Sequence, residues 1–270
     1  MTVGMNRGAA RLLPLWVVAG AAVAGGLVSC TEINAAAGHV ASLEFDTLPA
    51  PAVVAGDTLR DSLGRAAPLR AVAFNGAGNV IADPAIQYIA LDSGVTITAG
   101  HYLVAQRRSG SVRLIANATS IQSAVRTLLV ARQPDSVVVT GKLRDTLKYV
   151  LPDNVSSNST AGLSVKVVTR DTSGGITATQ GWLVSYQAFF GGKAIAPGDT
   201  SVAFLLSDGA QRSSLDTTSS DGTASRRVRV RPIGITQSAT DSVIVIATVR
   251  YRGSPVRGSP VRFVILLRPK

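Results

Sequence analysis

The sequence predicts an all-β protein of two tandem antiparallel β-sandwiches that follow a cleaved export signal. Ala, Val, Thr, Ser and Gly dominate the 270 residues, and aromatic residues make up only 5% of them. This composition favours short strands and tight turns over helices. With 46% hydrophobic residues the chain is too apolar to be a disordered tail. Beyond the first thirty residues, apolar positions alternate with polar ones instead of recurring at helical spacing.

The start of the chain has the pattern of a secretory signal. Arg7 and Arg11 precede an apolar run from Leu12 to Val28, and no acidic residue occurs before Cys30. A basic start, a short apolar run and a small-residue exit are typical of a cleaved signal peptide. The run is shorter than the roughly 20 strongly apolar residues that cross a membrane, so a retained helix anchor is the weaker interpretation. We expect residues 1–29 to be removed.

Cys30 is the only cysteine of the chain. The sequence Leu27-Val28-Ser29-Cys30 resembles the lipobox of bacterial lipoproteins. The resemblance implies cleavage before Cys30, a diacylglyceryl group on its sulfur and acylation of the new amino terminus. A thiolate is the strong nucleophile that such an alkylation needs, and two or more acyl chains anchor a protein stably where one does not.

Two other interpretations of this region remain open. Cys30 would be an ordinary buried residue if no lipid were attached. Cleavage after the A-x-A sequence at residues 35–37 would release a soluble protein. In the lipoprotein interpretation residues 30–40 form a lipidated tether. Thr31 stands where enteric lipoproteins of the inner membrane carry Asp, which favours the outer membrane of a bacterial cell envelope.

The first expected sandwich covers residues 41–131. Leu43 and Phe45 point to one side of a strand, and Val112, Leu114 and Ala116 do the same in a later one. The sequence "NGAGN" at 75–79 is a strong turn signal between strands. About seven short strands at regular spacing predict a β-sandwich.

The second expected sandwich covers residues 137–270, after the polar, Pro-containing segment "RQPDS" at 132–136. Its clearest strands are "SVIVIATVRYR" and "PVRFVILL". Val243, Val245, Ala247, Val249 and Tyr251 are expected to share one face of the first, and Val261, Phe263, Ile265 and Leu267 one face of the second.

Both halves resemble the bacterial Ig-like domains of surface proteins. The first half carries "VVAGDTL", "NGAGNVI" and "GSVRLIANA", and the second resembles the invasin/intimin type through a V-x-F strand and a T-x-x-D-G-x-A turn. The matching positions are Val202, Phe204, Gly209, Thr218, Asp221, Gly222 and Ala224. The resemblance implies stalks, adhesins and envelope interaction modules, without catalysis. Asp221-Gly222 is expected to form a tight turn with positive φ that leads into a strand.

Catalytic and metal-binding motifs are not found in the sequence. Its two histidines are His39 in the tether and His101, which we expect to begin a strand. Metal sites need several converging His, Cys or carboxylate ligands, and no cofactor motif such as G-x-x-x-x-G-K occurs. Asp216–Asp221 lacks the closing Glu of a calcium loop and is interpreted as a turn. We expect no enzyme, metal or cofactor; a hydrolase with an unrecognised site is a remote alternative.

Trp182 and Tyr186 are the most notable aromatic pair. An exposed indole can stack on a sugar ring, so the pair is a candidate ligand platform. Sandwich domains often bury a tryptophan on a central strand, and Val184 shares its face. Burial in the core is therefore the preferred interpretation.

Positive charge is concentrated at the end of the chain. Residues 31–225 contain 15 basic and 15 acidic side chains, whereas residues 226–270 contain ten basic ones and only Asp241. In "RRVRVR" three arginines are expected on one exposed face, and two more follow the next strand. A solvated strand face is the preferred interpretation, and a surface for anionic lipid or polymer the alternative. The candidate polyanion-binding residues are Arg227, Arg229, Arg231, Arg250 and Arg252.

Together these patterns favour a lipid-anchored envelope protein whose sandwiches act as a spacer or as an adhesion or interaction module. The alternative is a β-sandwich lipoprotein that binds a glycan or polyanion. The expected partners are the membrane, reached through the lipid, and an anionic envelope polymer or another surface protein. Nucleic acid is not expected, because no stacking aromatic residues alternate with the arginines.

Overall fold

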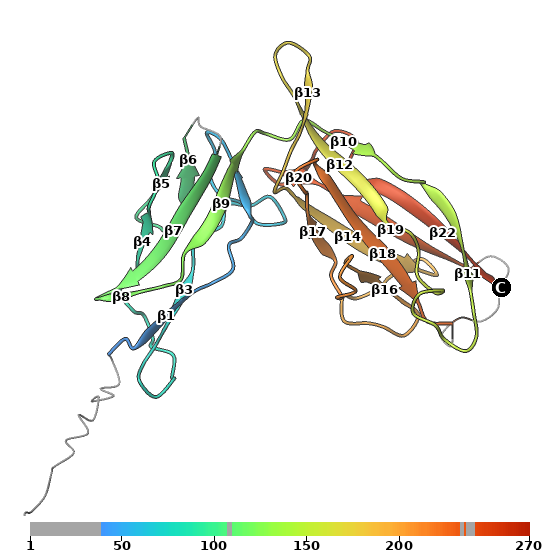
Figure 1. Cartoon of the computed structure of the whole chain (residues 1–270), viewed down its shortest axis with the longest axis horizontal. Coiled ribbons are helices and arrows are strands. Elements are labelled where there is room, and N and C mark those ends of the chain that lie inside the picture. Colours follow the sequence, from blue (N-terminus) through green and yellow to red (C-terminus); the bar gives the residue numbers. More distant parts are fainter. Residues whose placement is uncertain (1–38, 107–109, 233–234, 236–240) are drawn as a thin grey trace, which may run out of the picture. The chain divides into compact units, whose positions relative to one another are not determined.

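The computed structural model describes residues 39–106, 110–232, 235 and 241–270. The expected signal peptide, Cys30 and nearly all of the expected tether lie outside the described residues. Ala35–Lys270 forms one compact unit, and the secondary structure elements named within the described residues are strands (Figure 1). The predicted all-β class with two sandwiches is confirmed.

The first sandwich contains a five-stranded sheet and two short strand pairs. The sheet has the order β2 (Ala52–Val54), β9 (Arg126–Ala131), β7 (Gly110–Ala118) and β4 (Gln87–Ala90), with β8 (Ile121–Gln122) on β7. The pairs are β1 (Ser42–Phe45) with β3 (Ala71–Phe74), and β5 (Val95–Ile97) with β6 (Leu103–Ala105).

Buried side chains from all three sheets meet in one cluster, which we call the first core. Phe45, Leu103, Leu114 and Leu128 are among its fully buried members. The alternation read from the sequence is confirmed here, since Leu43 and Phe45 of β1 point inward while their neighbours are exposed. Period-two alternation therefore sets which side of each strand faces the core.

The second sandwich contains two larger sheets. One has the order β10 (Ser136–Val139), β12 (Leu163–Arg170), β18 (Thr223–Val230) and β16 (Ala203–Leu206), with β13 (Ile176–Ala178) on β12. The other has the order β11 (Arg144–Tyr149), β22 (Val261–Pro269), β19 (Ser242–Thr248), β14 (Leu183–Phe190) and β15 (Lys193–Ala194), with β17 (Leu215–Thr217) on β14. A small hairpin joins β20 (Arg250–Tyr251) to β21 (Ser254–Pro255).

The inner faces of these two sheets form the second core. Val165 and Val228 come from the five-stranded sheet, and Val184, Tyr186 and Phe263 come from the six-stranded one. The predicted buried faces of residues 243–249 and 261–267 are confirmed, because the alternate residues from Val243 to Val249 and from Val261 to Leu267 are all buried. Tyr251 is only partly buried.

Two strand pairs differ from the antiparallel arrangement that we expected throughout. β2 runs parallel to β9, and β11 runs parallel to β22. In each sandwich an early strand thus lies beside the last one and runs in the same direction. The sequence could not show this, because inward and outward residues alternate in the same way in parallel and antiparallel strands.

The segment between the sandwiches is held by the second one. The Asp135 amide donates to the Val168 carbonyl, and the Thr169 hydroxyl donates to the Gln133 carbonyl at 2.7 Å. No residue from 132 to 135 belongs to a strand, which agrees with a break at this place. The assignment of residues 41–131 and 137–270 as separate domains stays a prediction.

Two predictions about single residues concern turns, one at His101 and one at Asp221-Gly222. His101 does not begin a strand: it lies in the turn before β6 with φ at 64°, and its ring packs against Tyr88. The turn at Asp221-Gly222 is confirmed, with Gly222 at φ 81° directly before β18. A Cβ atom at Gly222 would lie 2.6 Å from the Val167 carbonyl oxygen, so only glycine fits this approach.

Candidate functional site

The basic strand β18 does not present its arginines on one exposed face. Arg226 and Arg229 are 5% and 4% exposed, whereas Arg227 is exposed. The expectation that Arg227, Arg229 and Arg231 share a solvated face is therefore wrong for Arg229. Arg226 and Arg229 are buried because segments from elsewhere in the chain lie against this strand.

The segment that covers Arg229 is the polar loop before β12. The Val230 amide donates to the Asn158 carbonyl, and the Thr160 amide donates to the Val228 carbonyl, so the loop lies against the strand. Arg229 forms an ion pair with Asp153 through two contacts of 2.7 Å. Asn158, fully buried, donates to the same carboxylate. Arg229 thus anchors this loop and is not available to a ligand.

The neighbouring arginines differ in their partners. Arg226 is buried against Asp216 at 2.9 Å and donates to the Ser213 and Leu215 carbonyls. Arg227 lies 3.6 Å from Asp208, and both side chains are exposed. Arg231 is exposed, with its guanidinium 5.8 Å from the centre of the Phe204 ring. Only Arg227 and Arg231 of this run are accessible.

Arg250 and Arg252 belong to the hairpin β20–β21 and not to the β18 surface. Arg252 and Gly253 both have positive φ, at 50° and 80°, as a tight two-residue hairpin turn requires. Arg250 donates to the Gly253 carbonyl across the hairpin. The five predicted arginines are thus divided between two places. Three of them form ion pairs: Arg229 with Asp153, Arg252 with Asp57, and the exposed Arg227 with Asp208.

Asp57 of the first sandwich is the partner of Arg252. Its carboxylate, 7% exposed, accepts hydrogen bonds from Arg60 Nε at 3.0 Å and Nη2 at 2.9 Å, and from Arg252 Nε at 3.1 Å. The Thr58 amide donates to it as well. Asp57 therefore joins a guanidinium from each sandwich.

The electrostatics of this site favour the charged form of the carboxylate. Burial by itself would raise the pKa of Asp57. Hydrogen bonds from Arg60 and Arg252, then from Thr58 and Tyr251, outweigh burial and hold the pKa far below its usual range. Asp57 is therefore ionised across the physiological range.

Apolar contacts close the same junction. Val54 belongs to the second core, and Leu183 of the second sandwich packs against the first core. At Gly64 a Cβ atom would lie 2.4 Å from the Gly253 amide nitrogen, so the two backbones touch. Each sandwich thus contributes side chains to the interior of the other.

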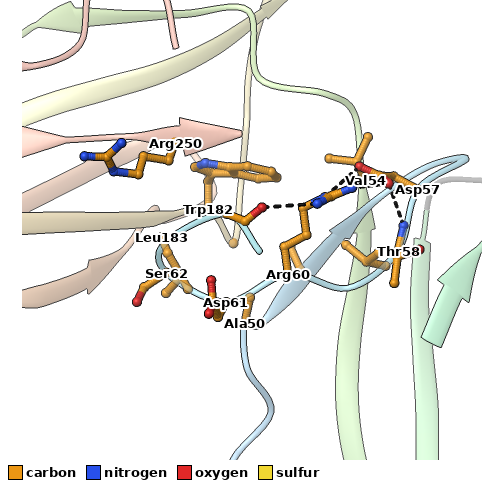
Figure 2. A pocket seen from close by; sticks show the side chains of 14 residues that line it. Ala50, Val54, Asp57, Thr58, Arg60, Asp61, Ser62, Trp182, Leu183 and Arg250 are labelled. Carbon is orange, nitrogen blue, oxygen red and sulfur yellow. Dashed lines mark hydrogen bonds and ion pairs between the residues drawn. The ribbon is translucent and has the colours of Figure 1, made fainter. Parts of the chain in front are cut away.

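A small cavity remains at the junction, lined by Asp57 and Arg60 on one side and by Trp182 and Arg250 on the other (Figure 2). Its volume is about 20 Å³. This is enough for a water molecule, whereas ligand pockets measure about 300 Å³ or more. The cavity beside Asp57 is therefore too small for a ligand.

The predicted aromatic platform is part of the core. Trp182 is 9% exposed and Tyr186 is 2% exposed. The Tyr186 hydroxyl donates to the Ala224 carbonyl at 2.9 Å, and burial raises its pKa further above 10. The Trp182 ring lies edge-on to Tyr251 at the junction. Neither ring offers a face on which a sugar could stack.

Sequence reasoning missed Asp57 and Arg60. The two residues are three positions apart, and this spacing was a local signal for an ion pair. The contribution of Arg252 had no local signal. Within the described residues, no group of three or more His, Cys, Asp or Glu side chains lies close enough together to hold a metal ion. In the same residues no helix has the length and apolar character needed to cross a membrane.

Among known proteins, solved structures are similar to the chain in fold. No known protein family matches the chain, and no curated protein matches it. The fold search finds similarity to the adhesin InvE of Yersinia pseudotuberculosis, with a TM-score of 0.32 and 12% identity, over 83% of this chain and 60% of that one. Domains 4 and 5 of the S-layer protein SbsC give a TM-score of 0.28 and 12% identity over 85% and 99% of the two chains. The D0-D1 domain of intimin gives 0.26 and 12% over 83% and 98%. The chain spans three fifths of the InvE structure, and similarity at these scores adds no argument about function.

Proposed function

We propose that this chain is a non-catalytic interaction module of the bacterial cell envelope. Lipid on Cys30 anchors it, with the outer membrane as the proposed location. The two β-sandwiches act as one stiff unit that serves as a spacer or adhesive element. The proposed partners are the membrane, reached through the lipid, and an anionic envelope polymer or another surface protein.

The observation that carries this proposal is the junction between the sandwiches. The Asp57 carboxylate takes hydrogen bonds from arginines of both sandwiches, and the Gly64 and Gly253 backbones meet with no room for a side chain. An ion-pair cluster and apolar contacts shared by two connected sandwiches restrain their relative motion. A spacer or a binding module benefits from such stiffness, because less conformational entropy is lost when it engages a partner.

The glycan-binding alternative loses its candidate residues, because Trp182 and Tyr186 are buried. A polyanion-binding role remains open for Arg227 and Arg231, whose side chains are exposed.

The lipid anchor is tested by the mass of the mature amino terminus and by detergent partitioning. We expect a wild-type chain that begins at a lipid-modified Cys30 and enters the detergent phase. The variant Cys30→Ala should keep its signal and remain unmodified, whereas the control Ser29→Ala should be processed normally, because the lipobox accepts Ala before the cysteine. A wild-type amino terminus at Gly38, or unchanged partitioning of Cys30→Ala, would refute the lipid anchor.

A further inference from the structure

Two strands of the second sandwich carry apolar residues on both faces. In β19 the inward residues Val243 and Val245 are buried, while the outward residues Ile244 and Ile246 are partly exposed. In β22 the outward residues include Val264 and Leu266, the latter 38% exposed. An antiparallel sheet with one side in water normally carries polar residues on that side. The outer face of this sheet departs from that rule.

The register of the strands gathers these outward residues. Ile244 pairs with Phe189 of β14 on one side and with Val264 of β22 on the other. Leu266 lies one outward position beyond Val264, and Ile246 one beyond Ile244. The strands β11, β22, β19 and β14 follow one another in this sheet and are labelled in Figure 1. We call this surface the outer patch; it consists of Phe189, Ile244, Ile246, Val264 and Leu266.

Basic side chains flank the outer patch on the side of β11 and β22. Arg144 pairs with Val264, Arg262 pairs with Ile246, and Lys148 pairs with Arg268. Arg262 and Lys148 each lie between buried residues. Arg268 follows the buried Leu267 on β22, and Arg144 lies four positions before Lys148 on β11, so all four share the outward side with the patch. The outward positions of β11, β22, β19 and β14 include no acidic residue, and within the described residues none of these four basic side chains forms an ion pair.

We propose that the outer face of this sheet docks on an anionic lipid bilayer. Contiguous exposed apolar side chains mark surfaces for protein or membrane contact. Apolar area together with basic residues is the combination that binds the interface of anionic membranes. The long stems of Arg and Lys can follow the bilayer surface while their charges reach the headgroups.

The charge of the surface argues against the other occupants. A second copy packed face to face would bring two sets of four cations together, which costs free energy. A purely hydrophilic polyanion would leave Phe189, Ile244 and Leu266 unused. A lipid surface satisfies both the apolar and the charged residues. The proposal goes beyond the envelope role above, and it does not depend on the lipid at Cys30.

Vesicle co-sedimentation tests the proposal with the full chain carrying Cys30→Ala, which excludes any contribution from acylation. Vesicles of phosphatidylcholine are compared with vesicles that also contain phosphatidylglycerol. The face variant replaces Arg144, Lys148, Arg262 and Arg268 with Gln. The control variant removes the same charge elsewhere, at the exposed residues Arg70, Arg132, Arg170 and Arg257. The apolar residues 12–28 are the same in every chain, so differences between variants report on the sheet.

We expect the face variant to bind anionic vesicles at least tenfold more weakly, because each surface cation adds roughly a fivefold factor and the variant removes four of them. The control variant should bind nearly as well as the parent. Equal losses in the two variants would mean a nonspecific charge effect and would overturn the proposal. A loss confined to an Arg227→Gln/Arg231→Gln variant would also overturn it, because lipid contact would then lie at the accessible arginines in and directly after β18.

A single labelled cysteine reports which side meets the lipid. With Cys30→Ala the chain contains no other thiol, so a polarity-sensitive dye can be placed by Leu266→Cys in the outer patch or by Val138→Cys on the outside of the opposite sheet. Val138 is 50% exposed and apolar, which makes it a matched control. We expect the emission to shift to the blue on anionic vesicles for Leu266→Cys only. A shift that grows with protein concentration without vesicles would mean that the outer patch contacts a second copy of the chain. A shift at Val138→Cys alone would mean that the five-stranded sheet contacts the lipid. Either result would refute the proposal.

Discussion

The Asp57 carboxylate of the first sandwich accepts a hydrogen bond of 3.1 Å from Arg252 of the second, across 195 positions of sequence. Arg60, three residues after Asp57, donates two more hydrogen bonds to the same carboxylate. One buried anion thus fixes the local turn and the distant hairpin together.

Replacing Asp57 should destabilise the protein strongly. In Asp57→Asn the partly buried Arg60 and the exposed Arg252 lose a buried anion, and we expect a loss of about 2 kcal/mol in the free energy of unfolding. Urea denaturation at neutral pH measures it. Asp61→Asn is the control, because Asp61 pairs with the well-exposed Arg65, and such pairs contribute at most about 1 kcal/mol. Equal effects of the two variants would show that the junction ion pairs stabilise the protein no more than an exposed pair does.

Acid should weaken the junction through the same carboxylate. The pKa of Asp57 is lower in the folded protein than its usual value of about 3.9. Its contribution to stability is therefore complete above about pH 4 and is lost as the pH falls toward the folded pKa. The unfolding free energy of the wild type should thus decrease more steeply below about pH 4 than that of Asp57→Asn. Parallel pH profiles of the two proteins would contradict this assignment.

The backbone contact at Gly64 predicts a second way to disturb the junction. Gly64→Ala adds a Cβ atom 2.4 Å from the Gly253 amide nitrogen. Gly56→Ala is a matched control, because Gly56 has φ 82° against 78° for Gly64 but open space around it. Both changes include the cost of positive φ, about 1 kcal/mol, and the clash should add a further 1–3 kcal/mol or so for Gly64 alone. Thermal unfolding of the two variants measures the difference, and identical melting temperatures would rule out a tight contact.

Substitutions of Arg229 and Arg227 should have very different effects on stability, although the two residues lie two positions apart on one strand. Arg229→Gln leaves Asp153 and the loop around Asn158 without their cation. Breaking a fully buried ion pair costs about 3–5 kcal/mol, but Asp153 is partly exposed, so we expect the free energy of unfolding to fall by about 2 kcal/mol. Arg227→Gln removes an exposed contact of 3.6 Å and should change stability by less than about 0.5 kcal/mol. Urea denaturation of both variants decides. A small effect at Arg229 would mean that the loop is held by its backbone hydrogen bonds alone.

Several features of the fold were predictable from local sequence. The buried faces of β19 and β22 followed from alternation, and the turn at Gly222 followed from Asp-Gly before a strand. The same strands also contained the signal for the outer patch, because "VIVIA" and "FVILL" are apolar without interruption. We read only one face of each, since alternation identifies an inward side but does not say what the outward side meets.

The candidate site was predictable only in part. The preferred interpretation of Trp182 and Tyr186 as core residues is confirmed by their burial. The arginine surface was misjudged at Arg229, because the loop that covers it comes from about seventy positions earlier in the chain. Arg252 was a candidate for external anions, yet it binds Asp57 of its own chain.

The sequence by itself determined the all-β class, the inward face of the main strands and the positions of turns, because these depend on residues within a few positions of each other. Only the tertiary structure decided which early strands run parallel to the last ones, which arginines are buried and how the two sandwiches are joined. Those outcomes depend on charges and backbones that meet from distant parts of the chain, and no local pattern records such a meeting.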